Sequence, residues 1–288
     1  MLEVRHAVVD GLFYPAAPAA LRAQVADFLV GACTGDATAR LPPKLLITPH
    51  AAYEYCGAVA ASAYALLGRV RARRMRPHGR PKGSYRSAQH EGTPMSRVVL
   101  LGPAHRVAVV GLAAPRAGAF ETPLGEVALD VAALASLDAL PQVVRDDRAH
   151  EREHSLEVQL PFLQALLGAF TLVPLVVGRA NAEAVAQVLE RLWGGGETLI
   201  VISSDLSHYL PYALAQRADL ATVQRILKLD AGLAPHEACG AAAINGALLA
   251  ARRHGLAPRL LDLRNSGDTA GERDRVVGYA AIAFEEPV

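Results

Sequence analysis

The segment TLIVISSDLSHYLP, residues Thr198–Pro211, decides the fold class of this chain. It opens with five apolar or β-branched residues and no polar alternation, which is typical of a strand buried on both faces of a sheet. The strand runs directly into Asp205 and His208. In open α/β sheets, ligands bind in the crevice beyond the carboxyl ends of the strands. The segment therefore predicts an α/β sheet with chemistry at the end of this strand.

The same pattern occurs twice more, in KLLITPH (Lys44–His50) and RVVLLGPAH (Arg97–His105). Each is a short apolar strand that ends close to a proline and a histidine. If the three strands are parallel neighbours, His50, His105 and His208 converge on one crevice. A single histidine at a strand end is more often structural. Two at equivalent strand ends favour a metal pair, because neutral imidazole is the commonest metal ligand.

Apolar runs and helical spacings alternate along the rest of the chain. This order predicts one α/β domain in which helices cover both faces of a mostly parallel or mixed sheet, and no repeat or linker divides it. The expected helices are Ala19–Val30, Ala58–Leu67, Val131–Leu140, an amphipathic helix after Asp146 that ends at Leu167, Ala182–Trp193, Tyr212–Leu229 and Pro235–His254. The further expected strands are Val107–Ala113, Phe170–Val177, Leu260–Leu263 and Val276–Phe284.

Composition limits the class of protein. With 288 residues, of which 52% are hydrophobic and 20% charged, the chain can bury a substantial core. It has no apolar run of the roughly 18 residues that a membrane span needs, and its N-terminus lacks the layout of a secretory signal. Three cysteines make no disulfide framework and suit a reducing compartment. We expect a cytoplasmic protein with no membrane contact.

Positive charge is concentrated in one segment although the net charge is only +1. Residues 68–97 hold eight arginines and one lysine against the single acid Glu91. Such a segment could contact nucleic acid or an acidic partner. It has many glycines and prolines and no aromatic interleaving, so we interpret Val70–Ser96 as a flexible insertion and consider nucleic-acid binding the weaker alternative.

Cys239 lies in PHEACGAAA, where we expect the first turn of a helix. The N–H groups and dipole at that end favour thiolate over thiol. Alone, the cysteine would more often be a small buried hydrophobe. Because His50 and His105 need a third ligand, we interpret Cys239 as that ligand. Cys33, in a loop, and Cys56, at the start of an alanine-rich helix, suit the role less well.

Asp205 and His208 are three residues apart, so both side chains could face the crevice from one turn. A carboxylate can hold an imidazole in one tautomer and raise its basicity, which would make His208 a general acid or base. The alternative is that Asp205 or a neighbouring serine caps a short helix and leaves His208 at the surface. We favour the catalytic interpretation.

The sequence HEREH, His150–His154, matches the H-E-x-x-H pattern of zinc peptidases. The match stands at the polar start of its expected helix, and no third ligand follows at the expected spacing. A zinc peptidase is therefore a remote alternative. We expect instead that His154 and Glu157 point into the crevice as substrate or supporting groups, with His150 near its rim.

A polar loop with Asn265 and Asp268 precedes the last strand, and it could close over a ligand or be an ordinary turn. The chain has no P-loop, no G-x-G-x-x-G after a strand and no G-x-S-x-G. Nucleotide binding and α/β-hydrolase chemistry therefore have no support from motifs.

Seven motifs in order resemble the Memo family, which includes the AmmeMemoRadiSam system protein B. They are GLFYP, PHAAYEYCG, LLGPAH, EHSLEVQLPF, VISSDLSHY, CG at the head of a helix, and NSGD followed by VVGYAA. The resemblance implies a fold like that of class III extradiol dioxygenases. It implies metal ligands at His50, His105 and Cys239, and an acid/base role for His208 beside Asp205. It also places Phe13 at the substrate pocket, where we add Tyr53, His154, Glu157, Asn265 and Asp268.

The resemblance further implies iron-dependent oxygen or redox chemistry on a small substrate, for which an aromatic compound is one candidate. Fe(II) is the expected metal, and the softness of a thiolate makes copper or zinc competitive. The alternative is a non-enzymatic module that binds metal and an anionic or aromatic peptide, such as a phosphopeptide. The implied partners are AMMECR-type and radical-SAM proteins. The chain departs from the family at Ala52 and Cys56, where glycine and serine are usual.

Overall fold

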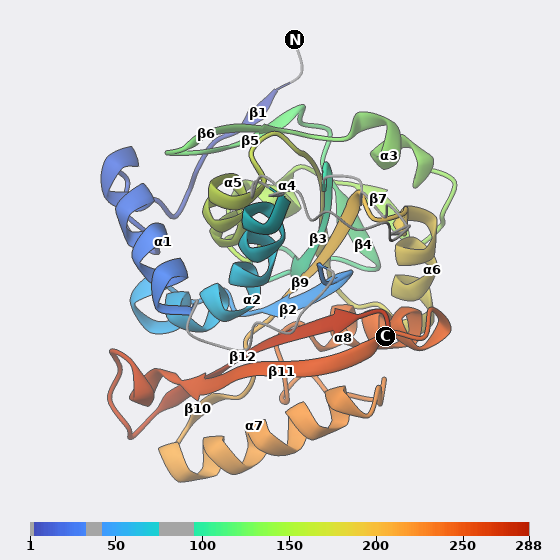
Figure 1. Cartoon of the computed structure of the whole chain (residues 1–288). Coiled ribbons are helices and arrows are strands. Elements are labelled where there is room, and N and C mark those ends of the chain that lie inside the picture. Colours follow the sequence, from blue (N-terminus) through green and yellow to red (C-terminus); the bar gives the residue numbers. More distant parts are fainter. Residues whose placement is uncertain (1–2, 33–41, 75–94, 288) are drawn as a thin grey trace, which may run out of the picture.

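Four parallel strands form the centre of the computed structural model, which describes residues 3–32, 42–74 and 95–287 (Figure 1). In spatial order they are β2 (Leu45–Thr48), β9 (Thr198–Ser203), β3 (Arg97–Pro103) and β8 (Thr171–Val177). Almost every residue in them is buried, as expected for strands covered on both faces. Because the strands are parallel, the segments that follow β2, β9 and β3 leave the sheet at one edge.

Antiparallel strands extend this centre on both sides, so the sheet is mixed. Beyond β2 lies β12 (Val276–Glu285), which pairs with β10 (His208–Leu210) and β11 (Ala257–Asn265). Beyond β8 lie β4 (Leu112–Ala114) and β7 (Val143–Arg145). A separate small sheet contains β1 (Val4–Arg5), β5 (Ala119–Thr122) and β6 (Gly125–Ala128).

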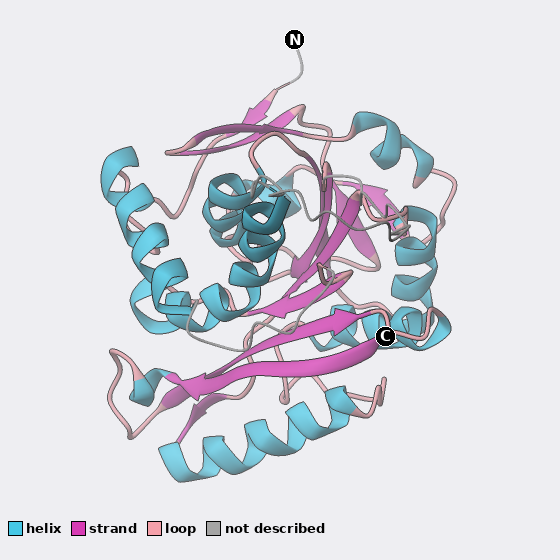
Figure 2. Cartoon of the chain, in the orientation of Figure 1, coloured by secondary structure: helices cyan, strands magenta, loops and turns pink. Residues whose placement is uncertain are grey.

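Helices cover both faces of the large sheet (Figure 2). Helices α1 (Pro18–Ala32), α2 (Tyr53–Arg74) and α5 (Leu160–Leu167) pack together on one side of the central strands. Helices α6 (Ala182–Leu192) and α8 (Ala241–Arg253) lie on the other, and α7 (Tyr212–Leu227) packs along β11 and β12. The remaining short helices are α3 (Val131–Ser136), α4 (Arg148–Glu151), η1 (Glu157–Gln159) and η2 (Ser266–Asp268). The prediction of a single α/β domain with a mixed, helix-covered sheet is confirmed.

Several predicted boundaries were wrong. The strand expected at 107–113 begins only at Leu112, and the helix expected from Pro235 begins at Ala241. The helix expected after Asp146 breaks into α4, η1 and α5, and Pro161 in the first turn of α5 suits only the start of that last helix. Helix α2 continues to Arg74, so the segment read as an insertion from Val70 starts as helix. The rest of that segment, 75–94, and Cys33 lie outside the described residues.

Among the residues that the structure describes, no helix combines the length and the apolarity needed to cross a bilayer.

Candidate metal site

Three histidines meet at the edge where β2, β9 and β3 end. His50 follows β2 by two residues and His105 follows β3 by two, on either side of β9. Their ring centroids are 5.1 Å apart. His154, from the turn between α4 and η1, stacks on His105 at 4.8 Å and meets His50 edge-on at 5.5 Å. One ring nitrogen from each histidine lies within 4.8 Å of the other two. The predicted convergence of three strand-end histidines is therefore confirmed for His50 and His105, whereas the third member of the cluster is His154 and not His208.

His50 is held from two directions. Its backbone N–H donates to Asp205 Oδ1 at 2.8 Å, and its ring Nδ1 lies 2.9 Å from Ser203 Oγ. Only 2% of the residue is exposed. This burial, with the neighbouring His105 and His154, holds the pKa of His50 well below its usual value. The ring is thus neutral at neutral pH, which is the form that binds metal.

His105 is anchored by Glu153, a residue for which the sequence analysis gave no role. The Glu153 carboxylate accepts the backbone N–H of His105 at 2.7 Å, and its other oxygen lies 2.9 Å from His105 Nδ1. Burial opposes ionisation of Glu153, but hydrogen bonds from His105 and Ser155 outweigh it and lower its pKa to about 2. An ionised carboxylate only accepts, so His105 donates from Nδ1 and keeps its lone pair on Nε2.

Cys239 contacts one member of this cluster, His50, but its sulfur is not among the donor atoms that lie within 4.8 Å of one another. Its Sγ lies 3.3 Å from His50 Nε2 and accepts the Asp205 backbone N–H, also at 3.3 Å. The expected place in the first turn of a helix was wrong, because Cys239 precedes Gly240, the N-cap of α8. Burial, with the nearby Asp205, raises the pKa of Cys239 to about 12. The metal-free side chain is therefore a thiol.

The expected pair of Asp205 and His208 does not form. Asp205 Oδ1 accepts the His50 N–H, while His208 Nδ1 lies 2.9 Å from the Leu206 carbonyl oxygen. A carbonyl only accepts, so His208 donates from Nδ1 and its Nε2 keeps a lone pair. The residue as a whole is exposed, but partial burial of its ring lowers the pKa of His208, as does the nearby His105. His208 is therefore a neutral base close to the cluster, oriented by the backbone.

The aromatic and acidic residues expected to face substrate divide into two groups. Phe13 packs its ring on His154 at 4.8 Å, next to the cluster. Tyr53 is buried and donates its hydroxyl to Val158 O at 2.7 Å.

Glu157 is fully buried and points away from the crevice, into the N-terminal segment. It accepts hydrogen bonds from Tyr14 Oη at 2.5 Å and from the backbone N–H groups of residues 8 and 9, and it pairs with Arg5. The expectation that Glu157 faces the crevice was therefore wrong; Glu157 fixes the segment that carries Phe13.

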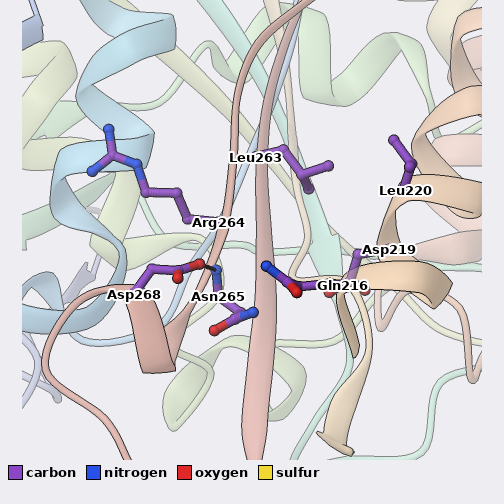
Figure 3. Close-up of a pocket in the computed structure, with 7 residues that line it drawn as sticks. All are labelled: Gln216, Asp219, Leu220, Leu263, Arg264, Asn265 and Asp268. Atoms are coloured by element: carbon purple, nitrogen blue, oxygen red, sulfur yellow. Dashed lines mark hydrogen bonds between the residues drawn. The ribbon is translucent and has the colours of Figure 1, made fainter. Parts of the chain in front are cut away.

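Asn265 and Asp268 line a pocket separate from the histidine cluster (Figure 3). They form a capping box on η2, in which Asn265 Oδ1 accepts the Gly267 N–H and Asp268 Oδ2 accepts the Asn265 N–H, both at 3.0 Å. They line a pocket of about 220 Å³ between α7, β11 and η2. Its other lining residues are Gln216, Asp219, Leu220, Leu263 and Arg264, and no histidine is among them.

His150 takes no part in the histidine cluster. It is 2% exposed, and its Nε2 donates to Ala113 O at 3.0 Å. Helix α4 ends at Glu151, so His150 and His154 do not share one helical face. The H-E-x-x-H interpretation, which needs both histidines on one ion, was wrong, and so was the expectation that His150 lies at the rim.

The donor set fits a transition metal. Zinc bonds of about 2.0 Å to imidazole and 2.3 Å to thiolate put two such ligands about 3.5 Å apart in a tetrahedral site. The 3.3 Å between Cys239 Sγ and His50 Nε2 is close to that value. His154 Nδ1 is buried and makes no hydrogen bond among the described residues, but it lies 3.4 Å from Glu153 Oε1. Burial lowers the pKa of His154 to about 4, so it too is a neutral donor.

Comparison with known proteins identifies the family. The family model described as Memo-like protein matches residues 5–75 and 82–283, and the interruption falls inside the basic segment. The chain is 34% identical to a MEMO1 family protein of Sulfolobus acidocaldarius, over 98% of this chain and 99% of that one. It is 34% identical to a relative in Methanopyrus kandleri, over 97% and 98%, and 31% identical to one in Archaeoglobus fulgidus, over 98% and 99%. The chain therefore belongs to the Memo-like family.

Proposed function

We propose that this member of the Memo-like family is a metalloprotein that binds iron through His50, His105 and Cys239 and carries out oxygen or redox chemistry on a small substrate. The observation that carries the proposal is the contact between Cys239 Sγ and His50 Nε2 at 3.3 Å, beside His105. A thiol and two imidazoles near one edge of the sheet match the donors of transition metals. His154 is a further imidazole beside this set.

Iron is preferred because two histidines and one anionic ligand leave open positions on Fe(II) for oxygen and substrate. When bound, the iron would supply the electrons and the binding positions for that chemistry. Cys239 provides the single negative charge that a carboxylate provides in the two-histidine sites of non-haem iron oxygenases. Thiolate is softer than carboxylate, so copper and zinc compete for the same donors.

The residues around the donor set have separate roles in this proposal. His208 takes or returns a proton from Nε2, because its Nδ1 hydrogen is committed to Leu206 O. Asp205 holds the backbone of His50 and, through its own N–H, the sulfur of Cys239. Phe13 supplies an apolar wall against His154, which suits a small apolar or aromatic substrate.

The test is the metal content of protein purified without oxygen, followed by oxygen uptake in the presence of simple catechols. We expect close to one iron per chain, a loss of iron in His50→Ala and His105→Ala, and oxygen uptake that needs the iron. Equal iron in the parent and in both variants would overturn the proposed ligands.

Oxygen consumption is tested separately from metal binding. An iron-loaded protein that consumes no oxygen with any catechol would remove the redox part of the proposal and leave a metal-binding protein. Peptide binding that survives complete metal removal would instead favour the binding module.

A further inference from the structure

We infer that Ser203 fixes which ring nitrogen of His50 carries the hydrogen, and thereby presents the Nε2 lone pair of His50 to the metal site. Ser203 is the last residue of β9, and its hydroxyl is completely buried. It lies behind the imidazole, on the side away from Cys239. The consequence for metal binding rests on the proposed function, but the position of the hydrogen does not.

The hydroxyl hydrogen of Ser203 is already used. Ser203 Oγ lies 2.5 Å from the carbonyl oxygen of Ser155. A carbonyl oxygen can only accept, so Ser203 must be the donor in this contact. A serine hydroxyl has one hydrogen, and none remains for His50.

Gln159 occupies one of the two lone pairs of Ser203. Its amide Nε2 lies 2.9 Å from Pro49 O and 2.8 Å from Ser203 Oγ. The Pro49 carbonyl can only accept, which fixes the amide orientation and makes Gln159 a donor to Ser203 as well. On its other side, Gln159 Oε1 accepts hydrogen bonds from Thr48 Oγ1 at 3.0 Å and Tyr64 Oη at 2.8 Å. Every hydrogen-bonding position of this buried amide is filled.

The remaining lone pair of Ser203 faces His50 Nδ1 at 2.9 Å. Ser203 has no hydrogen left to give, so His50 must donate from Nδ1. The neutral ring then carries its lone pair on Nε2, the atom 3.3 Å from Cys239 Sγ. His105 reaches the same tautomer through the Glu153 carboxylate. Ser203 is thus a positioning residue, which acts on the site through His50 and provides no charge of its own.

In the other tautomer of His50, the Nδ1 lone pair would face the Ser203 hydroxyl, which has no hydrogen left to donate. The hydrogen would then be on Nε2 and would point at the metal position. Outer groups that orient a metal-bound histidine affect metal affinity about 10–100-fold when they are removed. We expect Ser203 to have an effect of that size.

The direct test is the long-range proton–nitrogen spectrum of metal-free protein labelled with ¹⁵N-histidine. The His50 signals are assigned by their loss in His50→Gln. In the parent we expect Nδ1 to be the protonated nitrogen and Nε2 to be bare. In Ser203→Ala we expect the His50 signals to move towards the form protonated on Nε2.

The matched control is Ser207→Ala. Ser207 lies four residues further along the chain and is 3% exposed, and its hydroxyl is not a hydrogen-bond partner of His50. We expect its His50 spectrum to equal that of the parent. Zinc titration of the same proteins should show about 10–100-fold weaker binding in Ser203→Ala than in Ser207→Ala, with Ser203→Thr recovering part of the loss.

A parent spectrum with the hydrogen on Nε2 would overturn the inference, even if Ser203→Ala failed to fold. So would an unchanged His50 spectrum in folded Ser203→Ala. If the parent bound no metal but showed the expected tautomer, the proposed function would fail and this inference would stand.

Discussion

The sulfur of Cys239 lies 3.3 Å from Nε2 of His50, although the two residues are 189 positions apart in the chain. Asp205 maintains this contact from both sides, with its side chain and its backbone. The Asp205 carboxylate accepts the N–H of His50, and the Asp205 N–H donates to Cys239 Sγ. Asp205 also accepts the Cys239 N–H through its carbonyl at 3.2 Å. One residue at the end of β9 therefore sets the distance between the two proposed ligands.

We predict that Cys239→Ala lowers the affinity for iron or zinc by more than about 100-fold, because it removes a ligand rather than an orienting group. The measurement is a competition titration against a chelator, done without oxygen. Cys56→Ala is the matched control, because the Cys56 thiol is buried and donates to Ala51 O. Equal affinities in the two variants would contradict the role of Cys239.

We predict that Glu153→Gln weakens metal binding about 10–100-fold while the protein stays folded. Glutamine keeps the shape of the side chain, but its amide nitrogen cannot accept from His105, so the backbone N–H or Nδ1 of His105 loses its partner. The affinity is measured by the same titration. Glu151→Gln changes an exposed carboxylate two residues away and should bind metal like the parent. Unaltered affinity in Glu153→Gln would mean that His105 needs no anchor.

We predict that Glu157→Gln lowers the free energy of unfolding by about 3–5 kcal/mol, because it leaves the buried guanidinium of Arg5 without its counter-charge. Urea unfolding of metal-free protein measures the change. Glu121→Gln serves as the control, since Glu121 pairs with the exposed His6 and should change the free energy by less than about 0.5 kcal/mol. A small effect of Glu157→Gln would show that Glu157 does not hold the N-terminal segment.

The strand ends were predictable from the sequence, because buried parallel strands have a strong local signal. His50 and His105 were found from apolar runs that stop at a proline and a histidine, and parallel pairing with β9 brings them together. Cys239 was chosen because two candidate histidines need a third ligand, and the family resemblance implied the same residue; no local pattern distinguishes it from a buried hydrophobe. In the fold its sulfur lies 3.3 Å from His50 Nε2.

The residues that were missed or misassigned depend on side-chain contacts that sequence spacing does not encode. Glu153 stands between the two histidines of HEREH, and only the break between α4 and η1 turns it towards His105. Glu157, four residues or about one helical turn further along in the expected helix, points instead into the N-terminal segment. Asp205 and His208 have a suitable spacing, yet a nearer backbone carbonyl takes the imidazole. The segment EHSLE contains two acids, Glu153 and Glu157. The sequence analysis placed Glu157 in the crevice, whereas the acid that contacts a histidine of the cluster is Glu153.

His150 provides a prediction for the pH dependence of stability. Burial lowers its pKa to about 4, whereas the unfolded value is about 6.5. Between these values the unfolded chain binds a proton that the folded protein does not, so this contribution is present above pH 6.5 and is lost as the pH falls towards 4. His150→Gln can keep a donor to Ala113 O and does not titrate.

We therefore expect the loss of unfolding free energy between pH 7 and pH 5 to be smaller in His150→Gln than in the parent by about 2 kcal/mol. Urea unfolding of chelator-treated protein at both pH values measures it, and removing the metal keeps ligand protonation out of the comparison. Burial also lowers the pKa of His50, His154 and His208, so the variant should retain part of the acid sensitivity. Equal losses in the parent and the variant would show that His150 takes up its proton as readily in the folded protein as in the unfolded chain.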